Sequence, residues 1–228
     1  MGATVPVAYS GPVRAGTACN AARNREHGMS SSFDRRVVIT GLGVIAPIGQ
    51  TLETFWDNLV HGRSGITRLS AVDPDKFASK VAGQVHGFNP EEYFDPKEAR
   101  RMDRFVQFAM VAADMAVADS RLDMRREDPA RVGVIIGSGI GGLDTIEKQY
   151  QRFSARGSRA ISPFLIPMMI VDMASGLVSI KHGMTGPNLC VVTACATAAH
   201  SIGVAFRSIK FGDAEAYVVG GTEAAITD

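Results

Sequence analysis

The sequence predicts an α/β domain built on a mixed, mainly parallel sheet flanked by helices. Short apolar runs alternate along the chain with longer segments whose apolar residues recur every three or four positions, which is typical of this class. The run at residues 131–137 is apolar almost throughout, as in a strand that is covered on both faces. Residues 197–211 carry apolar side chains on one helical face and end at Gly212, a common helix stop.

The first expected strand and helix lie near the start of this domain. Residues 35–40, R-R-V-V-I-T, form a β-branched run, and Gly41 and Gly43 after it indicate a tight turn. A helix is expected at residues 51–61, because Thr51, or Gln50 just before it, can cap its first turn.

A long irregular excursion precedes the longest expected helix. Residues 63–96 contain three prolines and several glycines, with one short strand expected at 80–85. The helix is then expected to run without interruption over residues 96–120, with its apolar residues against a core.

Helices and strands continue to alternate in the second part of the chain. The most apolar stretch, residues 164–181, is interrupted by Pro167 and Asp172 and is short for a bilayer span, so we expect a buried helix and no membrane insertion. Further strands are expected at residues 189–194 and 216–219.

The composition is that of a globular protein without a strong charge preference. Of 228 residues, 46% are hydrophobic and 21% charged. The balance of 24 basic and 23 acidic residues gives a net charge of +1, which argues against nucleic acid as a partner and requires any docking of an acidic partner to be local. Three cysteines form neither a metal-binding pattern nor an even disulfide set, which favours a reducing compartment such as the cytoplasm.

Residues 1–34 differ in composition from the domain expected at residues 35–228. The first 28 of them are rich in glycine, alanine, proline and asparagine and lack helical or alternating apolar periodicity, so we expect a disordered leader. An arginine-bearing leader with few acidic residues also fits a transit peptide, which would place the protein in an organellar matrix. Met29 heads a second candidate start, so an over-long gene prediction is the alternative.

The strongest chemical signal is the segment V-V-T-A-C-A-T-A-A-H-S-I-G at residues 191–203. It places Cys195 where an expected strand meets a helix, and the free N–H groups at a helix start favour a thiolate. Small neighbours, Ala194 and Ala196, leave room for a bulky substrate. Free cysteines are more often inert core residues, and this is the reading we adopt for Cys190.

Five segments taken together resemble the condensing enzymes of fatty-acid synthesis. Besides the segment around the cysteine they are V-V-I-T-G-L-G, I-G-S-G-I-G-G, I-S-P-F-L-I-P and V-V-G-G-T-E, in this order from about residue 35 onward. The similarity is closest to the N-terminal half of type II β-ketoacyl-acyl-carrier-protein synthases.

This resemblance implies a thiolase-like fold, of which the chain holds the N-terminal half, and a homodimer. It implies a decarboxylative Claisen condensation in which Cys195 receives an acyl group from acyl carrier protein and malonyl-carrier protein supplies the attacking carbanion. No organic cofactor and no metal are expected, since phosphopantetheine arrives on the carrier protein.

The resemblance also assigns substrate-binding residues. Gly139 and Ile140 match the acyl pocket, with Ile140 as a movable gate, and Phe164 and Leu165 match a substrate-binding segment. Ordinary turn glycines are the alternative at residue 139.

Basic residues follow one another at helical spacing from residue 97. Lys97, Arg100, Arg101 and Arg104 fall at i, i+3, i+4 and i+7, which would put four cations on one helix face. By resemblance the first three match a docking patch for the acidic carrier protein. A solvated face is the alternative.

The resemblance further implies what to expect of the rest of the mechanism. Members of the family carry two active-site histidines and a lysine in the C-terminal half, and none of these matches a residue up to Asp228. We therefore expect no complete condensation from this chain alone. His200 and the other four histidines are read as structural.

Three alternative functions remain open at this level. A thiolase or acyltransferase of the same fold and a non-catalytic fragment are two of them. A dinucleotide-dependent reductase is the third, because residues 137–142 fit G-x-G-x-x-G and residues 41–46 fit G-x-G-x-x-A, although single matches of this kind are weak.

Overall fold

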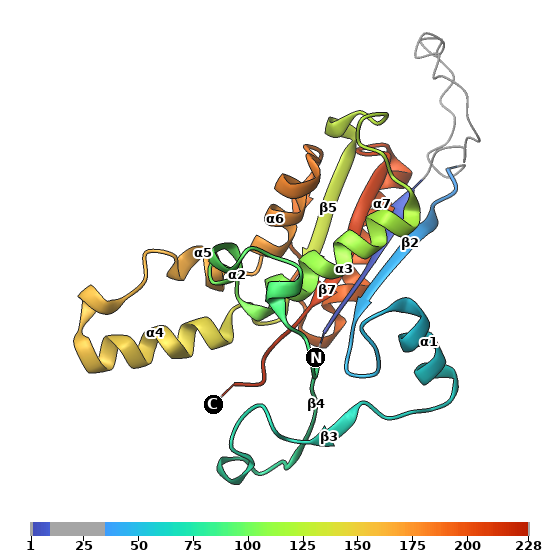
Figure 1. The fold of residues 1–228 in the computed structure, drawn as a ribbon. Helices are drawn as coiled ribbons and strands as arrows, with labels where there is room; N and C mark the ends of the chain where they lie inside the picture. Colours follow the sequence, from blue (N-terminus) through green and yellow to red (C-terminus); the bar gives the residue numbers. More distant parts are fainter. Residues whose placement is uncertain (1, 10–34, 228) are drawn as a thin grey trace, which may run out of the picture.

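The computed structural model describes residues 2–9 and 35–227 (Figure 1). The strands are β1 Ala3–Tyr9, β2 Val38–Ile45, β3 Ile66–Arg68, β4 Val81–Gly83, β5 Val132–Gly137, β6 Asn188–Leu189 and β7 Ala216–Thr222. The helices are α1 Leu52–Val60, α2 Pro96–Ala99, α3 Arg104–Ser120, α4 Leu143–Arg156, α5 Leu165–Met169, α6 Met173–His182 and α7 Thr197–Phe211.

Five strands form one mixed sheet in the order β2-β1-β7-β5-β6. β5 pairs in parallel with β6 and β7, while β1 runs antiparallel to both β2 and β7. β2, β7, β5 and β6 therefore point the same way, which confirms the predicted mixed, mainly parallel sheet. β3 and β4 pair separately, in the excursion that leads away from the sheet (Figure 1).

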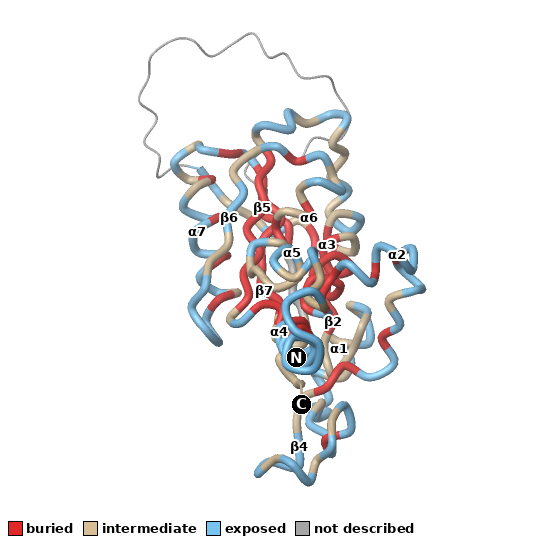
Figure 2. The backbone as a smooth tube through the Cα atoms, turned by 90° about the vertical axis from the view of Figure 1, so that its left-hand side faces the viewer, coloured by how far each residue is buried: buried red, intermediate tan, exposed pale blue. Residues whose placement is uncertain are grey.

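Helices cover both faces of the sheet, as the buried strands predict. Alternate side chains of the strands enter two separate cores: Val134 and Val218 pack toward α3 and α6, whereas Ile135 and Tyr217 pack toward α7. Figure 2 shows the buried residues gathered in β5, β7 and α3, while α4 is largely exposed. Together with α5, α4 extends away from the sheet (Figure 1).

The glycines at residues 41 and 43 lie inside β2 and not in a turn, so the expected strand end at residue 40 is wrong. A Cβ added at Gly43 would lie 1.9 Å from the carbonyl oxygen of Ala112, and one at Gly41 would lie 2.3 Å from that of Ala116. These glycines let the backbone of α3 approach the strand. Their spacing reflects helix packing, which argues against a nucleotide-binding turn.

The expected helix over residues 96–120 is two helices. α2 ends at Ala99 and α3 begins at Arg104, because the Asp103 carboxylate caps α3 by accepting a hydrogen bond from the N–H of Phe105 at 3.4 Å. Arg104 therefore does not continue the basic stripe. Its guanidinium donates to the Val85 carbonyl at 3.2 Å and lies over the ring of Phe108.

The expected buried helix over residues 164–181 is also divided. α5 ends at Met169 with an extended residue, Ile170, and α6 starts at Met173. In α6 the buried residues are Ala174, Ser175 and Val178. Among the described residues no helix is both long and apolar enough to cross a membrane.

The structure differs from the prediction of a leader without regular structure. Ala3–Tyr9 forms β1, which fills the sheet between β2 and β7, and Val7 is buried in the core. Residues 10–34 of the predicted leader lie outside the described residues.

Candidate active site

The carboxyl ends of three parallel strands meet at one edge of the sheet, and the predicted site lies there. β5 leads into the loop of residues 138–142, β6 into the turn that holds Cys195, and β7 into Glu223. In sheets of this kind, ligands bind outside the carboxyl ends of the strands.

Cys195 lies in a single 3-10 turn, Ala194–Ala196, directly before α7. The predicted strand over residues 189–194 ends early, at Leu189, and the chain continues irregularly to the turn. Cys195 is exposed and close to the start of α7, where the first N–H groups have no partners within the helix. The predicted meeting of strand and helix is therefore present, with a loop and a turn inserted.

Side chains from α7 hold this turn in place. The N–H of Thr193 donates to the Thr197 hydroxyl at 2.9 Å, and His200 Nδ1 lies 2.7 Å from the Thr193 hydroxyl. Ala194 has a φ of +51°, a conformation that non-glycine residues rarely adopt. Such strain persists only where the surroundings impose it, and it often accompanies a functional residue.

The two described cysteines differ in exposure. Cys190 is half-buried, and this burial is the main reason why the pKa of its thiol is raised, with a smaller rise from Asp172 against a lowering by a backbone hydrogen bond of Ser138. Cys195 is the exposed thiol of the pair. Cys19 lies outside the described residues.

Glu223 fixes the loop of residues 138–142. Its carboxylate accepts hydrogen bonds from the N–H of Gly139 at 2.8 Å, the N–H of Ile140 at 3.2 Å and the Ser138 hydroxyl at 3.2 Å. The Ser138 oxygen in turn accepts from the N–H of Gly141 at 3.0 Å. In the sequence this residue is only the last letter of the motif V-V-G-G-T-E, and no local signal predicts its role.

The same loop lies against the cysteine turn and against α5. A Cβ added at Gly139 would lie 3.5 Å from the Cα of Ala194, the residue before Cys195. On its other side the N–H of Gly142 donates to the Met169 carbonyl at 3.0 Å. The loop therefore joins the ends of three strands to α5.

The glycines of the G-x-G-x-x-G match face protein backbone. Added Cβ atoms at Gly137 and Gly142 would lie 2.1 Å from the Val191 carbonyl oxygen and 2.4 Å from that of Met168. Close packing of the chain on itself accounts for both residues, which argues against a pyrophosphate site.

The remaining predicted substrate residues surround this loop and α5. Ile140 is exposed by 51%, and Phe164 caps α5 with a partly exposed ring. Leu165 lines an apolar cavity of about 330 Å³ together with α4 residues such as Tyr150 and Phe153. These residues thus offer apolar surface near the loop, as an acyl-binding role requires.

One of the predicted docking residues lies beside the predicted substrate-binding segment. Lys97 is in α2, Arg100 and Arg101 follow it, and all three are exposed. The Arg101 guanidinium carbon lies 4.6 Å from the centre of the Phe164 ring. The structure therefore brings a residue of the predicted docking patch into contact with a predicted substrate-binding residue, although residues 101 and 164 are distant in sequence.

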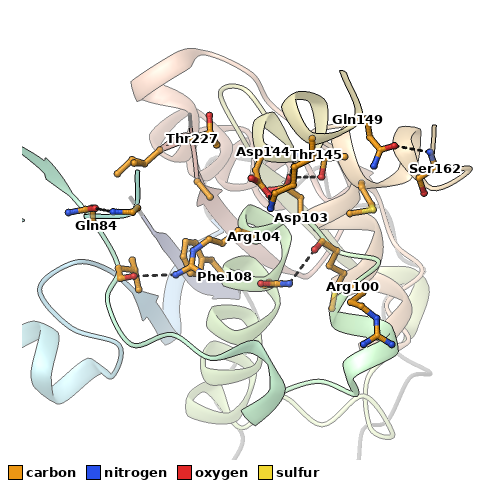
Figure 3. A pocket seen from close by; sticks show the side chains of 18 of the residues that line it. Gln84, Arg100, Asp103, Arg104, Phe108, Asp144, Thr145, Gln149, Ser162 and Thr227 are labelled. Atoms are coloured by element: carbon orange, nitrogen blue, oxygen red, sulfur yellow. Dashed lines mark hydrogen bonds and ion pairs between the residues drawn. The ribbon is translucent and has the colours of Figure 1, made fainter. Parts of the chain in front are cut away.

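A larger cavity of about 680 Å³, lined by both polar and apolar side chains, lies between α3 and α4 (Figure 3). Its buried carboxylate, Asp103, accepts hydrogen bonds from the Thr145 N–H at 3.0 Å and hydroxyl at 2.6 Å. Burial raises the pKa of Asp103 despite these hydrogen bonds. Cys195 does not line the cavity, so its size alone does not mark the thiol site. Sequence reasoning missed it, because its walls come from residues 71 to 227.

No cluster of metal-ligating side chains is found within residues 2–9 and 35–227. The described site is therefore a thiol, a turn and a loop, held by hydrogen bonds and close glycine contacts.

Comparisons with known proteins show what this chain is similar to. Over 196 residues the chain is 49% identical to 3-oxoacyl-[acyl-carrier-protein] synthase 2 of Staphylococcus aureus, covering 86% of this chain and 47% of that protein. The enzyme of the same name from Vibrio cholerae is 47% identical over 193 residues, covering 85% and 47%. The chain thus spans about half the length of these curated relatives.

Solved structures of ketosynthases have the same fold. A type II polyketide ketosynthase in complex with its acyl-carrier protein matches with a TM-score of 0.69 and 25% identity, over 83% of this chain and 50% of that one. The ishigamide ketosynthase/chain length factor matches with a TM-score of 0.69 and 29% identity, over 81% and 46%. Both are longer chains, as are the curated relatives. They confirm the predicted thiolase-like ketosynthase fold and its N-terminal half.

Residues 34–228 match the family model of the β-ketoacyl synthase N-terminal domain. Because this match includes the cysteine turn, the loop of residues 138–142 and Glu223, the chain belongs to the β-ketoacyl synthase family, of which it carries the N-terminal domain.

Proposed function

We propose that this chain forms the acyl-accepting half of a 3-oxoacyl-[acyl-carrier-protein] synthase that elongates fatty acids. The observation that carries the proposal is the exposed Cys195 thiol at the start of α7, in a strained turn beside the Gly139 loop. The curated relatives bear this enzyme name.

The first step is a thioester exchange. The thiolate of Cys195 attacks the acyl carbonyl carbon, the bond from that carbon to the carrier thiol breaks, and the carrier thiol leaves with a proton. The N–H of Cys195 is the proposed oxyanion donor, and loss of such a donor costs about 3 kcal/mol in comparable sites.

The second step is condensation. The malonyl group loses CO2, the resulting carbanion forms a C–C bond with the acyl carbon, and the bond from that carbon to Cys195 Sγ breaks. These steps as written need no organic cofactor. The enolate oxygen that develops needs stabilising donors, and we propose that these are the family's active-site histidines, which belong to the second half. His200 is read as structural, since its Nδ1 lies within hydrogen-bonding distance of the Thr193 hydroxyl. We therefore expect acylation of this chain without condensation.

The test is to incubate the purified 228-residue chain with carrier protein that bears an acyl thioester, and to locate the transferred acyl group by peptide mass spectrometry. Acyl groups are expected on Cys195 and to be lost in C195A, whereas C190A serves as the matched control. Acylation that persists in C195A, or steady formation of β-ketoacyl product by this chain alone, would contradict the proposal.

The acidic carrier protein is the proposed partner of Lys97, Arg100 and Arg101. The position of Arg101 beside Phe164 favours docking over a merely solvated face, because a bound carrier would then deliver its acyl chain near the Gly139 loop. One solved ketosynthase is itself seen in complex with an acyl-carrier protein.

Charge reversal tests this docking. Three exposed ion pairs at about 0.2–1 kcal/mol each sum to roughly a tenfold change in affinity. We expect the triple variant K97E/R100E/R101E to weaken carrier binding by this amount and the wild-type affinity to fall with salt. R126E, beyond the other end of α3, is the control. Equal affinities of the triple variant and the wild type would exclude the patch.

A second copy of the chain is the other proposed partner. Large apolar side chains are exposed at the β6 edge and on α7, including Leu189, Val192 and Phe206. Surfaces of this kind mark interaction sites. A reducing compartment, either the cytoplasm or an organellar matrix, fits a mechanism that requires a free thiol at Cys195.

A further inference from the structure

A buried carboxylate joins two parts of the chain that the proposed function uses separately. Asp103 is 3% exposed and lies two residues beyond Arg101, the last residue of the predicted docking patch. Its carboxylate accepts hydrogen bonds from the N–H and the hydroxyl of Thr145, in the first turn of α4 (Figure 3). That turn directly follows the loop of residues 138–142. Asp103 therefore connects the end of the docking patch to the end of this loop.

The role of Asp103 as the cap of α3 does not by itself require burial. Asp95 caps α2 in the same way, by accepting a hydrogen bond from the N–H of Lys97 at 2.8 Å, and Asp95 is exposed. Burial removes water from a carboxylate, which costs free energy unless hydrogen bonds replace that water. At Asp103 the replacing donors belong to Thr145, 42 residues further along the chain. The buried pair therefore fixes the start of α4 to the start of α3, which a cap alone does not do.

The pair of Asp103 and Thr145 is the main polar tie between α4 and the docking side of the domain. α4 packs chiefly against α5 and residues 158–160, and it extends away from the sheet (Figure 1). Within the part of the chain that the structure describes, no other hydrogen bond or ion pair joins α4 to α2, α3 or the residues between them. The contact of Arg101 with Phe164 is a second link between the two sides, but both of these side chains are partly open to solvent.

α4 in turn holds the predicted substrate-binding residues. Its first turn continues the loop that contains Gly139 and Ile140, and a Cβ added at Gly142 would lie 3.0 Å from a carboxylate oxygen of Asp103. One turn further along α4, the buried Gln149 accepts a hydrogen bond from the N–H of Ser162 at 2.8 Å (Figure 3). Ser162 lies two residues before Phe164. The position of α4 therefore sets where both the loop and this segment lie relative to the docking patch.

We propose that Asp103 is a positioning residue which, through Thr145, fixes the docking patch relative to the acyl-binding loop; this inference rests on the proposed function. A docked carrier presents its acyl group at the end of an arm of fixed length, so a shift between patch and loop displaces the acyl carbonyl from Cys195. A small acyl thioester that does not dock is free of this requirement. Glu223 differs from Asp103, because it holds the part of the loop beside the cysteine turn and is needed with either donor.

The experiment measures the rate of Cys195 acylation in the 228-residue chain with two donors, an acyl thioester on the carrier protein and the same acyl group on the small thiol N-acetylcysteamine. D103N removes the charge and one acceptor, so we expect acylation by the carrier to slow on the order of tenfold. The rate with the small donor and the affinity for the carrier are expected to be unchanged, because the cysteine turn and the three cations remain. D144N, which alters a partly exposed carboxylate in the same turn of α4, is the matched control and should keep both rates.

A milder variant covers the case in which D103N does not fold. T145V removes only the hydroxyl donor, so acylation by the carrier is expected to slow by roughly two- to tenfold, the effect of one hydrogen bond. E223A should slow acylation by both donors, which shows that the assay detects a displaced loop. Equal slowing with both donors in D103N or T145V, or an unchanged rate with the carrier, would overturn the inference while the proposed function stands. No acylation of wild-type Cys195 by either donor would refute the proposed function, and this inference with it.

Discussion

Replacing Glu223 with alanine tests whether the loop of residues 138–142 depends on one carboxylate. The change removes the acceptor that Gly139 N–H, Ile140 N–H and the Ser138 hydroxyl share. A hydrogen bond to a charged group contributes about 1.5–3 kcal/mol when it is buried. Ile140 is exposed and water replaces its bond, whereas Ser138 is fully buried. We therefore expect E223A to lower the free energy of unfolding by about 2–4 kcal/mol.

The isosteric variant separates the carboxylate charge from its shape. E223Q keeps one acceptor oxygen, so we expect roughly half the loss, about 1–2 kcal/mol. Because the loop lies against Ala194, the rate of Cys195 acylation is also expected to fall, on the order of tenfold for a small displacement of the turn.

Urea unfolding and amide exchange measure these effects. Exchange is expected to accelerate at Gly139 and Gly141, with E91A, which removes an exposed carboxylate, as the control. The reasoning would be refuted if E223A changed the free energy of unfolding by less than about 0.5 kcal/mol, the usual range of surface substitutions. It would fail equally if the loop exchanged as slowly in the variant as in the wild type.

Three further predictions concern the thiols, the acid limb of stability and the packing of β2. Limiting iodoacetamide at pH 7 is expected to label Cys195 before Cys190, because burial raises the pKa of the Cys190 thiol. Peptide mass spectrometry measures the order of labelling, and the reverse order would contradict the site assignment. Burial alone would raise the pKa of Asp114, but hydrogen bonds from His182 and Lys181 lower it overall, so its stabilising contribution is present at neutral pH and lost below about pH 4. In urea unfolding from pH 3 to 6, the free energy of unfolding of D114N should therefore fall less steeply with decreasing pH than that of the wild type. An equally steep fall in the two proteins would exclude this role. G43A is expected to destabilise the protein by more than about 3 kcal/mol or to prevent folding, since its Cβ would lie 1.9 Å from the Ala112 carbonyl oxygen. In G203A, a control in α7, the added Cβ meets open space, so this variant should be more stable than the wild type by up to about 1 kcal/mol. Similar unfolding midpoints for the two variants would contradict the packing argument.

The sequence predicted the bounds of a helix correctly where a residue at its end acts as a local start or stop signal. The bounds of α7 agree with the prediction, because Gly212 at φ +85° ends it, and α1 begins after Thr51 as expected. The break before α3 was missed although Asp103 is a good helix cap, since apolar periodicity continues across it. β1 was missed for the opposite reason: Pro6 and a bland composition favour no strand, and only the neighbouring strands make it one.

Predictions for the site divide in a similar way. Cys195 and Gly139 stand in recognisable motifs, and the structure places them at the same edge of the sheet. The role of Glu223 could not be read from the sequence, because its partners are backbone amides more than 80 residues away. A backbone N–H is present at every residue except proline, so the sequence alone does not distinguish the two that receive this carboxylate.

The position of the cysteine turn explains why acyl transfer and condensation are expected to separate in this chain. The contacts described for the turn come from α7 and the loop of residues 138–142, and the loop is held by β7 through Glu223. All of these elements belong to one sheet and one covering helix. The proposed nucleophile is therefore held by contacts internal to the N-terminal domain, whereas the donors for the enolate are proposed to come from the second half. A domain divided in this way can form the acyl-enzyme with its own contacts and still depend on the other half for carbon–carbon bond formation.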